Sequence, residues 1–87
     1  MVKVLYLIAA AKSLRIVAWH VKQPERDSVL TEINRGAPGQ YIAGEVEIDG
    51  VNVSYRPADL VVPDQFRQEF RAAVDALAPV GSQKRWS

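Results

Sequence analysis

The dipeptide Asp49-Gly50 lies between two runs of alternating residues and constrains the fold of this chain more than any other feature. Asp-Gly in such a setting is a strong signal for a β-hairpin with a two-residue turn. Counting outward from an Ile48/Val51 pair divides the side chains between two faces. One face carries Ile42, Val46, Ile48, Val51, Val53 and Tyr55, and the other carries Ala43, Glu45, Glu47, Asn52, Ser54 and Arg56. The sequence therefore predicts a hairpin over 41–56 with one buried and one solvated face.

Two more strands are predicted near the N-terminus, at 2–10 and 14–21, joined around Lys12 and Ser13. Both segments are rich in β-branched and aromatic residues, which are typical of strands. A helix over 4–12 is the alternative, because several apolar residues there also fall on helical spacing. The β-branched residues favour strands.

Two helices are predicted, each opening near a proline. Pro24 and the acids that follow it indicate the start of the first helix, and Gly36 is expected to end it as a left-handed cap. Its apolar stripe is narrow and consists of Val29, Leu30 and Ile33. The second opens at Pro63 and is the most strongly patterned, with one apolar stripe of Phe66, Phe70, Val74 and Leu77 and a solvated face of Arg67, Gln68, Arg71 and Asp75.

The order strand, strand, helix, strand, strand, helix predicts an α+β fold with a four-stranded antiparallel or mixed sheet. The connection rules favour the strand order first, second, fourth, third, with both helices on one face. This is a permuted ferredoxin-like arrangement. Two ββα units packed about a pseudo-twofold axis are the alternative. Residues 1–80 are expected to form one domain, and 81–87 a flexible basic tail.

Two short helices on one face would leave the other face of the sheet open, and the N-terminal strands are apolar on both of their faces. Contiguous exposed apolar area usually marks an interaction site. We therefore expect a homodimer formed through Tyr6, Val17, Trp19 and Val21. The function that this favours is a non-catalytic protein-interaction module, serving as a structural or regulatory subunit of a larger assembly.

The charge distribution supports a second hypothesis. The net charge is only +1, but residues 1–24 contain four basic residues and no acid. The N-terminal hairpin could therefore bind nucleic acid or another anion through Lys3, Lys12, Arg15 and Lys22. Against this, the polar face of the 41–56 hairpin carries Asn52 and Ser54 where a base-stacking sheet would need aromatic residues.

Catalytic signatures are weak. His20 is the only histidine and there is no cysteine, so we expect no enzyme, no metal site and no cofactor. A small dimeric enzyme with a pocket between subunits is a third hypothesis, in which Glu25 or Asp27 would have to orient His20. Glu45 and Glu47 share a face, but an ion pair between Glu45 and the diagonal Arg56 is favoured over paired-carboxylate chemistry.

No membrane span is expected, because the longest apolar stretch, Val4 to Ala11, is far shorter than the roughly 20 residues that cross a bilayer. The N-terminus does not carry a convincing signal peptide either. A cytoplasmic location is therefore the expectation.

Overall fold

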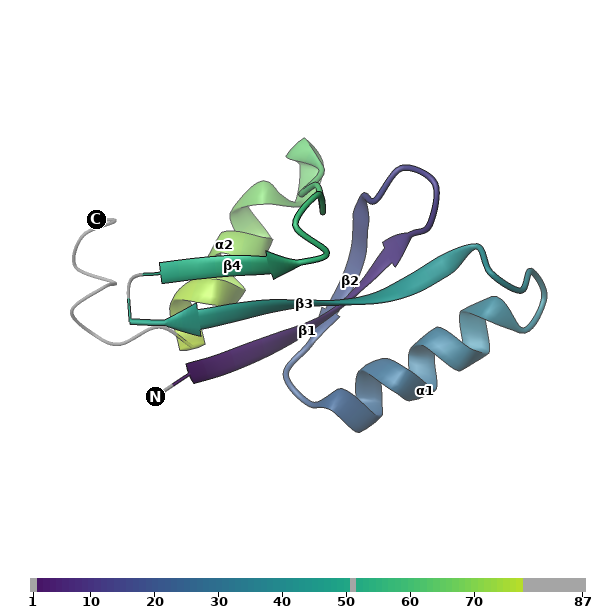
Figure 1. The fold of residues 1–87 in the computed structure, drawn as a ribbon, viewed down its shortest axis with the longest axis horizontal. Helices are drawn as coiled ribbons and strands as arrows, with labels where there is room; N and C mark the ends of the chain where they lie inside the picture. Colours follow the sequence, from purple (N-terminus) through teal and green to yellow (C-terminus); the bar gives the residue numbers. More distant parts are fainter. Residues whose placement is uncertain (1, 51, 78–87) are drawn as a thin grey trace.

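The computed structural model describes residues 2–50 and 52–77 and shows a four-stranded antiparallel sheet with two helices (Figure 1). The elements follow the predicted order, which confirms the α+β class. They are β1 (Val2–Ala10), β2 (Ile16–His20), α1 (Gln23–Asn34), β3 (Tyr41–Asp49), β4 (Asn52–Arg56), the short 3-10 helix η1 (Asp64–Phe66) and α2 (Arg67–Leu77). The flexible tail predicted at 81–87 lies outside the described residues.

The strand order differs from the prediction. The strands lie in the order β2-β1-β3-β4, so β1 is an inner strand and β4 is an edge strand. β1 and β3 pair along their whole lengths, from Val2 opposite Asp49 to Ala10 opposite Tyr41. β1 is apolar on both faces, and such strands are typical of the middle of a sheet that is covered on both sides. The predicted order first, second, fourth, third is therefore wrong.

The two helices lie on opposite faces of the sheet rather than together on one. Leu5 and Leu7 of β1 belong to the core cluster that contains Phe70 and Val74 of α2. The alternate residues of β1 point the other way, and there the guanidinium of Arg26 from α1 lies 5.4 Å from the centre of the Tyr6 ring. The placement of both helices on one face is therefore also wrong, and β1 is enclosed between α1 and α2.

The faces of the β3–β4 hairpin are as predicted, but its register is shifted by two residues. Ile48 pairs with Val53 and Asp49 with Asn52, instead of Ile48 with Val51. A two-residue shift keeps every side chain on its face, because side chains alternate with a period of two. The shift makes Gly50, with a φ of 63°, the first residue of the connection, where hairpin turns need a left-handed residue. Residue 51 is outside the described residues.

The end of α1 also differs from the prediction. The helix ends at Asn34, followed by Arg35 in the right-handed region, and the residue with positive φ in this loop is Gly39, not Gly36. The Asn34 side chain accepts a hydrogen bond from the Tyr41 N–H and donates one to the Tyr41 carbonyl, both at 3.1 Å. These two bonds hold the returning chain beside the helix, so that a glycine cap at 36 is not required.

The segment between β4 and η1 crosses the α2 face of the sheet and reaches the far edge. Val61 exchanges main-chain hydrogen bonds of 2.8 Å with Leu14 and Ile16 at the start of β2. On the way, Leu60 passes so close to β3 that a Cβ atom at Gly44 would lie 2.8 Å from the Leu60 Cδ1 atom. Glycine at 44 permits this crossing. The β2 edge is therefore partly covered by the connecting segment.

Candidate protein-interaction site

The outer side of β4 carries no further strand within the described part of the chain. In an antiparallel pair, hydrogen-bonded and non-hydrogen-bonded residue pairs alternate. The pair Asp49–Asn52 flanks the two-residue connection and is of the hydrogen-bonded kind, and so is the pair that contains Ser54. The main-chain N–H and C=O groups of Val53 and Tyr55 consequently point outward, away from β3. Within the described residues these groups face no further strand.

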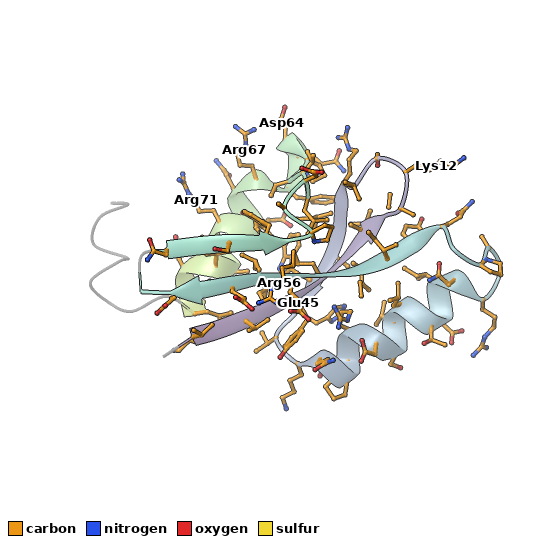
Figure 2. All side chains as sticks on the ribbon, viewed as in Figure 1. Lys12, Glu45, Arg56, Asp64, Arg67 and Arg71 are labelled. Atoms are coloured by element: carbon orange, nitrogen blue, oxygen red, sulfur yellow. The ribbon has the colours of Figure 1, made fainter. Side chains whose placement is uncertain are left out.

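A groove of about 420 Å³ lies between β4 and α2, beside this edge. Most of its lining is apolar, and two arginines of α2 complete it. The lining residues are Val53, Tyr55, Val62, Arg67, Phe70, Arg71 and Val74. Figure 2 shows Arg67 and Arg71 projecting from the part of α2 that emerges beyond the open edge of β4. The groove therefore has an apolar floor and a cationic rim.

The floor is held in place by an aromatic cluster. The Tyr55 ring stacks on Phe70 with centroids 6.3 Å apart, and the Trp19 ring packs edge-on against Phe70 at 5.3 Å and against Phe66 at 6.1 Å. Such arrangements add to the stabilisation from buried area alone. The cluster joins β2, β4 and α2, so that the groove is built on rigid elements.

Burial in this groove raises the pKa of Tyr55 above its ordinary value of 10.0. A raised pKa in the folded protein means that the neutral phenol stabilises the fold below about pH 10, and that this contribution is lost as the pH rises through the folded-state pKa. We expect the wild type to lose stability relative to Tyr55→Phe above that pH. Urea unfolding of both proteins between pH 8 and pH 11 measures the difference. A difference in the free energy of unfolding that stays constant over this range would contradict the expectation.

The four residues predicted to form a dimer interface do not share one surface. Tyr6 lies on the α1 face beneath Arg26, whereas Trp19 lies on the α2 face against Phe70. Val17 is the extra residue of a β-bulge, because Ile8 pairs with Ala18 and Ala9 with Ile16. Val17 and Val21 are exposed. Trp19 thus packs against the hydrophobic core of its own chain.

The four basic residues of the nucleic-acid hypothesis form two separate pairs. Lys12 and Arg15 lie at the turn between β1 and β2, where Figure 2 shows Lys12 at the tip. Lys3 and Lys22 lie at the opposite end of the hairpin. At about 3.3 Å per residue, the strand from Lys3 to Ala10 alone spans roughly 23 Å. The structure does not bring the four side chains into one patch.

The candidate acid and base groups are placed as follows. His20 lines a shallow depression with Glu25 and Ser28, and its Nε2 atom is buried without a hydrogen-bond partner. Glu25 is exposed, so it is not the buried carboxylate that an oriented histidine base would need. No cluster of metal-ligating side chains occurs in residues 2–50 and 52–77.

The carboxylates of β3 are also placed differently from the prediction. Arg56 lies directly opposite Glu45 in the register, but its guanidinium is paired with the diagonal Glu47. Figure 2 shows Glu45 and Arg56 together on the face away from α2. The predicted ion pair with Glu45 is therefore wrong. Long side chains reach diagonal neighbours as readily as direct ones, because the distances differ by only a few ångströms.

Sequence reasoning missed the groove, although it placed the individual residues well. Val53 and Tyr55 were assigned to the buried face of their hairpin, and Arg67 and Arg71 to the solvated face of their helix. These β4 and α2 residues line one open groove only because β4 is an edge strand. The predicted strand order placed that strand inside the sheet. The sequence carries no signal for this arrangement, because it shows Val53 as apolar but does not show that β4 lies at the edge of the sheet.

Comparison with known proteins found no family model, no curated protein and no solved structure that matches this chain. None of the described helices has the length and apolar character needed to cross a membrane.

Proposed function

We propose that this chain is a small protein-interaction module in which an extended segment of a protein partner adds a fifth strand along β4. One coincidence carries the proposal: the outward main-chain groups of Val53 and Tyr55 lie beside a groove that their own side chains help to line. Strand addition needs both features, because main-chain hydrogen bonds supply affinity and a side-chain groove supplies selectivity.

The composition of β4 supports this role. Natural sheet edges are usually protected against pairing by charges, prolines or bulges. β4 contains no proline, and its pairing with β3 is regular. Its one charged residue, Arg56, is paired with Glu47 on the face away from α2. On the α2 side, Val53 is 36% exposed. The edge is thus partly apolar and, among the described strands, has no neighbour on its outer side.

We expect Val53→Pro to lower the affinity for an extended peptide at least tenfold, while Val53→Thr changes it less than threefold. Proline removes the outward N–H of residue 53 but no hydrogen bond to β3, and prolines are tolerated at such edge positions. The measurement is an NMR titration with a capped heptapeptide of alternating threonine and valine. The wild type should also show slower exchange of the Val53 and Tyr55 amide protons when the peptide is bound. Equal affinities of the two variants, with both folded by circular dichroism, would refute strand addition at this edge.

Self-association through the N-terminal strands is a second proposal, supported by the first residues of β1. β1 pairs with β2 only from Tyr6 onward, so that the stretch Val2–Leu5 has a partner strand on one side only within the described residues. Val2 and Val21 near this stretch are exposed. Sedimentation tests it directly, because a particle with the monomer mass across a wide concentration range would end the proposal.

A further inference from the structure

We infer that the occupant of the β4–α2 groove is an acidic extended segment, in which two carboxylates on one face of the added strand meet Arg67 and Arg71 and an apolar residue enters the groove. The inference rests on the proposed function and specifies the chemistry of the partner at the same site.

The geometry allows one strand to reach both features. In Figure 1, α2 passes behind β4, and its first turns emerge beyond the open edge, where an added strand would lie. Arg67 and Arg71 are one helical turn apart and about 6 Å apart along the axis, at roughly 1.5 Å of rise per residue. Alternate residues of an extended chain are separated by a similar distance, about 6.6 Å. Two carboxylates with one residue between them therefore have a spacing similar to that of the two arginines.

The charged residues that line the groove are both basic, which favours an anionic occupant. The residues that line it include both arginines and no acid. Arg67 is paired with Asp64 at 2.7 Å, but the Arg67 side chain is 71% exposed and that of Asp64 is 91% exposed. An exposed pair of this kind contributes little to stability, and a guanidinium has five N–H donors. Arg67 can therefore accept a second carboxylate or exchange the first.

A second copy of this chain fits the groove less well. The residues of β4 that would turn toward α2 in a paired copy are Val53 and Tyr55, which carry no carboxylate. Such a copy could fill the apolar floor, but its strand would bring no carboxylate to the arginine rim. Charge complementarity therefore selects an acidic segment of a different protein.

The test compares three capped heptapeptides with threonine at odd positions and valine at the sixth. The second and fourth residues are glutamate, glutamine or lysine. We expect the wild type to bind the glutamate peptide about tenfold more tightly than the glutamine peptide at low salt, and the lysine peptide least. Arg67→Glu should lower affinity for the glutamate peptide about tenfold and leave the glutamine peptide within about twofold.

Arg35→Glu is the matched control. Arg35 is also a largely exposed arginine, paired with the acid three residues before it, Glu32, but it follows α1 and lies outside the groove. It changes the net charge by the same amount and should alter the affinity for the glutamate peptide less than twofold. Equal effects of Arg67→Glu and Arg35→Glu, or no preference of the wild type for glutamate over glutamine, would overturn the acidic inference.

The two proposals fail in different ways. If Val53→Pro abolishes binding of every peptide but Arg67→Glu changes nothing, the docking edge stands and the acidic partner is rejected. If Arg67→Glu abolishes the preference while Val53→Pro has no effect, acidic recognition stands and strand addition is rejected. If the wild type forms a dimer that Val53→Pro dissociates, a second copy occupies the edge and the acidic inference falls.

Discussion

Replacing Arg26 with alanine is expected to lower the free energy of unfolding by about 3 kcal/mol, because Arg26 anchors α1 to the sheet. Its side chain is almost completely buried, and Arg26 is the one buried residue of α1. Nη1 donates hydrogen bonds to the carbonyl of Gly44 at 2.9 Å and to that of Leu7 at 3.4 Å, and Nε pairs with Asp27 at 2.7 Å. Urea unfolding followed by circular dichroism measures the loss.

Two further variants separate the anchoring role from the charge. Arg26→Met keeps most of the aliphatic volume and should cost only about 1 kcal/mol, because a well-packed apolar residue often replaces a buried ion at little cost. Arg35→Ala removes an exposed arginine and should change stability by less than about 0.5 kcal/mol. If Arg26→Ala proves no more destabilising than Arg35→Ala, then Arg26 does not anchor α1.

Arg26 also shows why the helix arrangement could not be predicted. An arginine in the first turns of a helix is ordinarily solvated, and the visible apolar stripe of α1 was Val29, Leu30 and Ile33. In the structure Ile33 is exposed, and the helix is docked by a guanidinium that reaches two main-chain carbonyls. Those carbonyls belong to adjacent strands, β1 and β3. The sequence pattern does not show that these two carbonyls lie side by side, because that depends on the strand order.

Local periodicity, in contrast, correctly predicted the elements, the faces of the 41–56 hairpin and the buried stripe of α2. The alternation in 41–56 assigned Val46 and Ile48 to the buried face, and both are buried. The helical spacing of Phe70 and Val74 likewise predicted the buried stripe of α2. These signals depend on neighbours a few residues away. Strand order is a long-range property, and the apolar character of both faces of β1 was interpreted as an exposed surface when it reflects a central position.

The candidate site depends on the same long-range information. The residues of the groove come from β4 and α2, and their proximity follows from the edge position of β4 together with the crossing of 57–63 over Gly44. A sequence pattern shows that Val53 is apolar and faces the core side. It does not show that a neighbouring strand is missing, which is the property that makes Val53 part of a docking edge.

Phe70→Ala is expected to be the most destabilising substitution in α2, with a loss of about 4 kcal/mol in the free energy of unfolding. Phe70 is buried and lies at the centre of the aromatic cluster, in contact with both Trp19 and Tyr55. A domain of this size has a total stability of about 5–10 kcal/mol, so the variant should be close to the limit of folding. Urea unfolding followed by circular dichroism at 25 °C measures the loss.

Phe66→Ala is the matched control for this effect. Phe66 carries the same side chain one turn earlier, but it is only partly buried and contacts Trp19 at the longer centroid distance of 6.1 Å. We expect it to cost about 1 kcal/mol. Phe70→Leu should fall between the two, at about 1.5 kcal/mol, because it conserves much of the buried volume. A loss for Phe66→Ala equal to that for Phe70→Ala would show that the cluster is not centred on Phe70. In that case the groove floor would depend on the start of α2 rather than on its middle.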